Sequence, residues 1–131
     1  MEVRDGMSSV VLTIGPSLSL TEAARLMSER NVGAAIVIDP ESPGPGIVTE
    51  RDILRSVADG QTSGTERVGD HLTDELIVAA PDWSLEQAAE AMLDGGFRHL
   101  LVVKGAEIEG VLSVRDIVRC WAKDRVAGSR S

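Results

Sequence analysis

The chain repeats its own pattern once, and this repeat limits the possible folds more strongly than any other feature of the sequence. Matching residues recur at a spacing of 65, and after a single one-residue deletion they recur at a spacing of 64. Chance rarely preserves one order of residues over such a length with one gap, so we infer two copies of one structural unit. The matched positions are Pro16 with Pro81, Ala23 with Ala88, Met27 with Met92, and residues 46–53 with residues 110–117.

Both copies predict the same element order, β-α-β-β-α. The first helix of each copy has apolar residues at a 3.6-residue period, and Ser19 with Glu22 predicts a capping box at its start in the first copy. Glycine is expected to end this helix, at Gly33 in the first copy and at Gly95 and Gly96 in the second. The expected strands are 10–13, 35–38 and 47–48, then 76–78, 100–103 and 111–112, and the last helices start at Thr49 and Ser113.

With 131 residues the chain suits one compact module made of two halves. We place the halves at 1–64 and 65–131, with a short flexible tail at the C-terminus. No run approaches the ~18 uncharged apolar residues of a membrane span, and the first residues lack the apolar core of a secretory signal. A single cysteine, Cys120, excludes an internal disulfide framework. These features predict a cytoplasmic protein.

The formal charge of −8 disfavours partners that carry a phosphate backbone. Aromatic residues make up only 2% of the chain, which is too few for a binder that stacks single-stranded bases. We therefore expect no nucleic-acid partner. A small anionic ligand stays open, because eleven of the thirteen basic residues are arginine, and arginine makes bidentate contacts with phosphate.

The duplicated unit resembles a pair of CBS domains, also called a Bateman module. The resemblance rests on the pattern Gly-apolar-apolar-Thr/Ser-x-x-Asp, which occurs at 46–52 and in register at 110–116, and it covers roughly residues 3–123. It implies an α/β (α+β) fold of tandem β-α-β-β-α repeats with pseudo-two-fold symmetry, whose sheets pack face to face and leave two clefts. It also implies a regulatory or sensor module that binds an adenosine-containing nucleotide such as AMP, ADP or ATP, with no chemistry of its own.

The resemblance implies that Asp52 and Asp116 bind the ribose and that Thr49 and Ser113 contact ribose or phosphate. These positions open a helix, where free N–H groups and the helix dipole favour an anion. A simpler interpretation stays open, because the same residues form capping boxes that merely start a helix. Arg51 and Arg115 lie beside the two aspartates, as ligands or as part of a solvated helix face.

The two copies differ just before the second strand. Arg98 and His99 stand there in the second copy as candidate phosphate contacts, although Arg98 could instead pack its stem over the sheet with its head in water. Ala34 stands at the matching place in the first copy and leaves space for a base. The resemblance further implies that backbone near the first strand contacts the adenine edge, at Ile14 in the first copy and at Ala79 and Ala80 in the second.

No catalytic or metal motif is present. The sequence has no phosphate-binding loop and no nucleophile elbow, and His71 and His99 lack partners at metal-ligand spacing. We therefore expect no enzyme, no cofactor and no metal, with an adenine nucleotide as regulatory ligand and output through an effector protein in trans or through oligomer state. The alternative is a ligand-free dimerisation module. The expected homodimer interface consists of Ala23, Met27, Ala88 and Met92, or of Ile53, Ile117 and Trp121.

Overall fold

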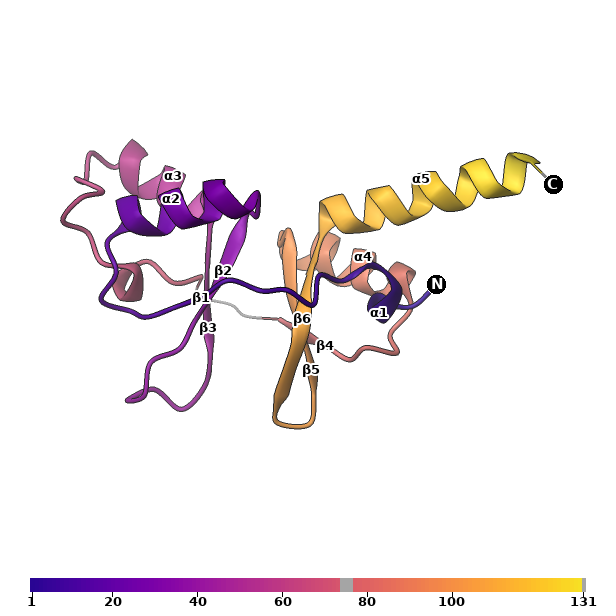
Figure 1. Cartoon of the computed structure of the whole chain (residues 1–131), viewed down its shortest axis with the longest axis horizontal. Coiled ribbons are helices and arrows are strands. Elements are labelled where there is room, and N and C mark those ends of the chain that lie inside the picture. Colours follow the sequence, from indigo (N-terminus) through magenta and orange to yellow (C-terminus); the bar gives the residue numbers. More distant parts are fainter. Residues whose placement is uncertain (74–76, 131) are drawn as a thin grey trace. The chain divides into compact units, whose positions relative to one another are not determined.

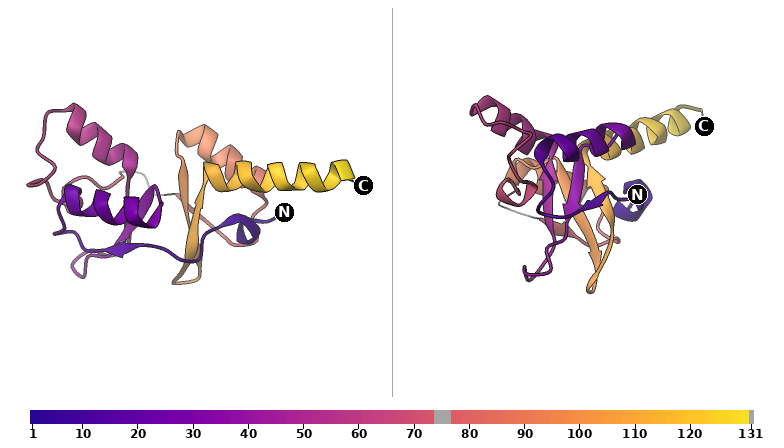
Figure 2. Two further views of the ribbon diagram at one scale, coloured as in Figure 1. Left: turned by 45° about the horizontal axis from the view of Figure 1, so that its top comes forward. Right: turned by 60° about the vertical axis from the view of Figure 1, so that its left-hand side comes forward.

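The computed structural model describes residues 1–73 and 77–130, with side chains to residue 124. The described residues form two compact units, and each has a three-stranded sheet with two longer helices on one face (Figure 1). We call residues 11–73 the first unit, and residues 1–10 together with 77–130 the second unit. Figure 2 shows both units from two further sides.

The sheet of the first unit has the order β1-β2-β3, with β1 parallel and β3 antiparallel to the central strand. All four side chains of the central strand are buried, which explains its continuous apolar sequence. The elements of this unit are β1 (Thr13–Ile14), α2 (Leu20–Arg30), β2 (Ala34–Val37), β3 (Gly46–Thr49), α3 (Glu50–Ala58) and the 3₁₀ helix η1 (Val68–Asp70).

The second unit repeats this topology with the order β4-β5-β6. Its hairpin is longer than that of the first unit, and its register shifts between Val102 and Val103. The elements of this unit are α1 (Val3–Gly6), β4 (Val78–Ala79), α4 (Leu85–Gly95), β5 (His99–Lys104), β6 (Glu107–Ser113) and α5 (Val114–Arg130).

The mixed α/β class and the repeated β-α-β-β-α order are confirmed, with some boundaries shifted. The first long helix, α2, ends with Asn31 as its C-cap, which adopts φ 54°, and not at Gly33. Asparagine tolerates the left-handed region, so it closes a helix in place of glycine. The last helix, α5, extends to Arg130. Leu76 of the expected strand 76–78 lies outside the described residues, and β4 follows at Val78–Ala79.

Two short helices, α1 and η1, were not expected from the sequence. Both contribute a fully buried valine, Val3 in α1 and Val68 in η1. Val3 belongs to the core of the second unit and Val68 to the core of the first unit. The compact units therefore differ from the sequence halves 1–64 and 65–131, because the opening segment of each repeat packs with the strands of the other repeat.

The apolar faces of α2 and α4 build the cores. Ala23 and Met27 pack against the sheet of the first unit, and Ala88 and Met92 against that of the second. These four side chains are buried within the chain, so the expectation that they form a dimer interface is wrong. The second expected set is also mostly covered, since Ile117 is buried and Ile53 packs against the core. Trp121 is exposed.

No helix in the described part of the chain has both the length and the apolar character needed to cross a membrane.

Candidate functional site

The first candidate site lies where β3 meets α3. Thr49 is the N-cap of α3, and its N–H donates to Asp52 Oδ2 at 2.8 Å, while Asp52 N–H donates to Thr49 Oγ1 at 3.3 Å. Two hydroxyls also donate to Asp52 Oδ2, from Thr49 at 3.0 Å and from Thr73 at 2.7 Å. The described residues give Asp52 Oδ1 no hydrogen-bond partner. We call Thr49, Asp52 and Thr73 the Asp52 site.

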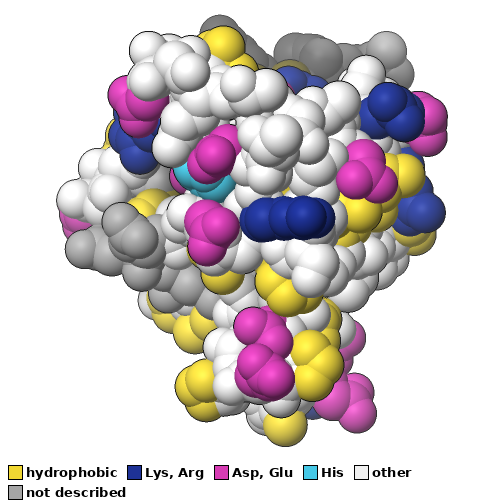
Figure 3. Space-filling view, turned by 90° about the vertical axis from the view of Figure 1, so that its left-hand side faces the viewer, with side chains coloured by type: hydrophobic (Ala, Val, Ile, Leu, Met, Phe, Trp, Pro, Cys, Tyr) yellow, Lys and Arg dark blue, Asp and Glu magenta, His cyan; other side chains and the backbone are white. Residues whose placement is uncertain are grey.

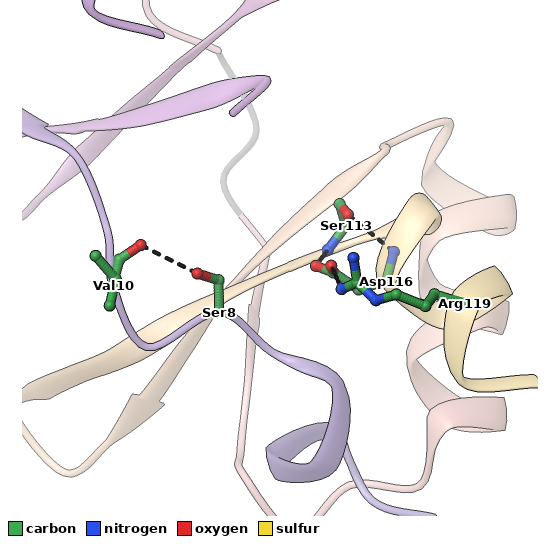
Figure 4. A network of polar contacts seen from close by, with 5 residues as sticks. All are labelled: Ser8, Val10, Ser113, Asp116 and Arg119. Carbon is green, nitrogen blue, oxygen red and sulfur yellow. Dashed lines mark hydrogen bonds and ion pairs between the residues drawn. The ribbon is translucent and has the colours of Figure 1, made fainter. Parts of the chain in front are cut away.

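The second candidate site lies at the junction of β6 and α5 (Figure 4). Ser113 N–H donates to Asp116 Oδ2 at 2.8 Å, and Asp116 N–H donates to Ser113 Oγ at 3.1 Å. The guanidinium of Arg119 forms an ion pair with Asp116 Oδ1. Asp116 is 9% exposed, and it is the only charged residue that is buried in the described part of the chain. We call Ser113, Asp116 and Arg119 the Asp116 site.

Both sites contain a complete capping box. The interpretation of these residues as helix caps is therefore correct for both helices. Capping and ligand binding do not exclude each other here, because a carboxylate offers about four acceptor positions. The cap at Asp52 uses only Oδ2. A ribose hydroxyl can therefore donate to Oδ1 of Asp52 without breaking the cap.

The strand register brings some of the predicted residues to these junctions. Ala34 lies directly across from Thr49 on the neighbouring strand, and His99 lies across from Ser113. The carbonyl of Arg98 accepts a hydrogen bond from Val114 N–H at 2.9 Å, and its side chain is exposed. Arg51 and Arg115 are also exposed, each on the first turn of its helix. Across the strand from its cap, the first copy thus has the small Ala34, and the second has His99, which follows Arg98.

The residues expected to contact adenine lie elsewhere in each sheet. Ile14 pairs with Val37, at the opposite end of β2 from the Ala34–Thr49 pair, and β1 and β3 are opposite edges of the sheet. Ala79 pairs with Val102 in the equivalent place. Both Ile14 and Ala79 are buried, and the Ile14 carbonyl already accepts from Ile38 N–H at 3.1 Å. Neither unit by itself brings these residues to its aspartate.

Ala80 follows Ala79 directly and is half-buried, and the second unit by itself does not bring it to Asp116 either.

Sequence reasoning missed Thr73 and Arg119, although the repeat contained the signal for both. The spacing of 65 places Ser8 on Thr73, and the spacing of 64 places Arg55 on Arg119. The structure confirms the first equivalence, because Thr73 N–H donates to Ile47 O and Ser8 N–H donates to Val111 O, both at 2.9 Å.

The side chains of both sites accept and donate hydrogen bonds, and Asp116 also forms an ion pair with Arg119. Among the described residues, no group of three His, Cys, Asp or Glu side chains is placed to hold a metal ion. The face drawn in Figure 3 has acidic and basic side chains interspersed, with no broad basic patch on that face.

Comparison with known proteins agrees with this description. The family model for the CBS domain matches residues 2–59 and 68–123. The CBS domain-containing protein YhcV of Bacillus subtilis is 34% identical over 128 residues, which cover 97% of this chain and 90% of that protein. The chain spans 66%, 43% and 50% of the length of three other curated relatives.

Solved structures share the fold. The CBS-domain containing protein ATU1752 from Agrobacterium tumefaciens has a TM-score of 0.81 at 31% identity, over 90% of this chain and 91% of that one. The CBS domain pair of protein MJ0100, in complex with 5′-methylthioadenosine and S-adenosyl-L-methionine, has a TM-score of 0.82 at 22% identity, over 95% and 98%.

Proposed function

The chain belongs to the CBS domain family, and on that premise we propose that it is a regulatory module that binds an adenosine-containing nucleotide at the Asp52 and Asp116 sites. The observation that carries this proposal is the repeated capped aspartate, which presents a fixed carboxylate at a helix N-terminus in each unit. The complex of MJ0100 supports it, because that protein holds two adenosine compounds on the same fold.

Each residue of the sites has a role that its chemistry supports. Asp52 and Asp116 accept hydrogen bonds from ribose hydroxyls. The N-terminal turns of α3 and α5 favour a phosphate, and Thr49 or Ser113 contacts ribose or phosphate. Exposed Arg98 supplies a charge-assisted phosphate contact in the second copy.

Further contacts extend these roles. Arg51 and Arg115 on the first helical turns add charge for a phosphate, and His99 adds a ring nitrogen beside Ser113. Ala34 leaves room for a base beside Thr49. Backbone near Ile14, Ala79 and Ala80 contacts the adenine edge.

A thermal-shift panel with AMP, ADP, ATP and S-adenosylmethionine tests the proposal. A ligand that binds only the native state adds about 2.7 kcal/mol at a concentration of ~100 Kd. The melting temperature should then rise by several degrees for a chain of this size. If none of these compounds at millimolar concentration moves the melting temperature of nucleotide-free protein, the proposal is wrong.

A matched variant separates ligand binding from helix capping. Asp116→Asn weakens both the cap of α5 and the ribose contact, whereas Ser84→Ala removes only the N-cap of α4. Both variants should melt at lower temperature than the wild-type protein. Only Asp116→Asn should also reduce the shift that the nucleotide produces.

The alternative is a dimerisation module that needs no ligand, and exposed apolar side chains on α5 favour it. Val114, Val118 and Trp121 are 40%, 57% and 44% exposed, and their spacing places them on one helix face. A second copy of the chain would cover this stripe. Light scattering that gives twice the 13.9 kDa mass, with no response to the nucleotide panel, would favour this alternative.

Dimerisation and nucleotide binding can occur in the same protein. We propose that the chain is a homodimer that passes its signal to an effector protein in trans. A buried free cysteine, Cys120, is compatible with a reducing compartment, and we propose the cytoplasm.

A further inference from the structure

The two homologous aspartates are held in different states. Three hydrogen bonds from the Asp52 site reach a single carboxylate oxygen, Oδ2, and all come from uncharged donors. Asp116 receives one bond at Oδ2 from backbone N–H, and its other oxygen, Oδ1, is paired with the positive charge of Arg119. Among the residues that the structure describes, Asp52 Oδ1 thus has no hydrogen-bond partner, whereas Asp116 Oδ1 has a counter-ion.

The difference does not come from the presence of the arginine, because both repeats carry one three residues after the aspartate. Arg55 occupies the place of Arg119, and its side chain does not bind Asp52 in the described structure. The hydroxyls at the equivalent positions 73 and 8 also differ in their acceptors. Thr73 donates to Asp52, whereas Ser8 donates to Val10 O at 3.0 Å, and Asp116 is paired with Arg119 (Figure 4).

We propose that Arg119 is a specificity-determining residue of the Asp116 site: a ribose hydroxyl must displace its guanidinium from Asp116 Oδ1, and the displaced guanidinium then binds an anionic group of the same ligand. This inference rests on the proposed nucleotide binding. The side chain of Arg119 is 52% exposed, so the guanidinium is not locked in place.

The consequence is a division of ligand preference between the sites. A neutral nucleoside breaks the Arg119–Asp116 ion pair and offers nothing in return. A nucleotide offers its phosphate, which pairs with guanidinium at least as well as a carboxylate does. The Asp52 site needs no such exchange, so it accepts nucleoside and nucleotide with a smaller difference.

Calorimetric titration with adenosine and with AMP tests this, on an Asp52→Asn background that leaves the Asp116 site as the intact one. Arg119→Ala should strengthen adenosine binding about two- to fivefold, the range for loss of an exposed ion pair. The same variant should weaken AMP binding about tenfold, as loss of a charge-assisted hydrogen bond implies. The preference for AMP over adenosine therefore collapses, and its dependence on salt concentration falls with it.

Arg55→Ala is the matched control, made on an Asp116→Asn background that leaves the Asp52 site as the intact one, and it should leave the ratio of the AMP and adenosine affinities unchanged. If the protein binds nucleotide but Arg119→Ala changes both affinities by the same factor, the proposed role of Arg119 is wrong. The same holds if Arg55→Ala changes the ratio of affinities as much as Arg119→Ala does. Neither result contradicts the proposed nucleotide binding. Wild-type protein that binds neither compound overturns both.

Discussion

At the scale of single residues, the hydroxyl of Thr73 distinguishes the Asp52 site from the Asp116 site. Its hydroxyl donates to Asp52, and its N–H donates to the Ile47 carbonyl of the neighbouring strand. The hydroxyl of the equivalent Ser8 is exposed and stays within its own loop. A hydrogen bond to a charged, half-buried acceptor stabilises a fold more than one made at the surface.

We expect Thr73→Val to lower the free energy of unfolding by about 1 kcal/mol, because the near-isosteric change removes the donor to Asp52. Thr73→Ser should retain most of that stability. Ser8→Ala should cost less than about 0.5 kcal/mol, as exposed substitutions do. Urea denaturation monitored by circular dichroism measures all three, and equal losses for Thr73→Val and Ser8→Ala would contradict this role.

At the scale of elements, the glycine that begins the repeated motif is explained by the segment packed over its strand. A Cβ on Gly110 would lie 2.3 Å from the Ser8 carbonyl oxygen, and one on Gly46 would lie 2.9 Å from the Leu72 side chain. A backbone oxygen held by Val111 N–H cannot move aside, whereas the end of a leucine side chain can turn. Glycine is therefore needed for packing at both positions, and more strictly at Gly110.

The same substitution should thus have unequal effects in the two repeats. Gly110→Ala is expected to cost about 3 kcal/mol, the upper range for overpacking, because the α1-to-β1 connection must separate from β6. Gly46→Ala is expected to cost about 1 kcal/mol, since Leu72 can repack. Thermal denaturation of the pair decides this, and a Gly46→Ala variant that is the less stable of the two would refute the explanation.

At the scale of the whole molecule, the opening segments of the repeats are exchanged. Val3 and Val68 are equivalent in sequence, fully buried, and located in the units of the opposite repeats. Val3 N–H donates to Trp83 O, and Val68 N–H donates to Leu18 O. Neither repeat can complete its core alone, so the two repeats depend on each other to fold.

Truncating either valine should cost about 2 kcal/mol, because each is completely buried. The two variants should differ in where the structure loosens. Val3→Ala should speed amide hydrogen exchange in β5 and β6, and Val68→Ala should speed it in β2 and β3. If Val3→Ala instead speeds amide hydrogen exchange in β2 and β3, the opening segments are not swapped between the repeats in solution.

Much of the fold and part of the site followed from local patterns. The alternation of apolar runs and caps predicted both β-α-β-β-α units, and Ser19 and Ser84 begin their helices as N-caps. The Thr49 and Ser113 caps were predicted with their aspartates for the same reason. Propensity, periodicity and capping act over three to eight neighbouring residues, so a linear reading detects them.

What the linear reading missed was long-range. Thr73 contacts Asp52 across 21 positions, and α1 joins a sheet that begins more than seventy residues later. Such contacts depend on which of the two equivalent sheets a segment joins. The two repeats have the same apolar pattern, so the pattern alone does not indicate which sheet a segment will join. The choice is made by connection geometry and by atomic packing at places such as Gly110, and these arise only once the chain is folded.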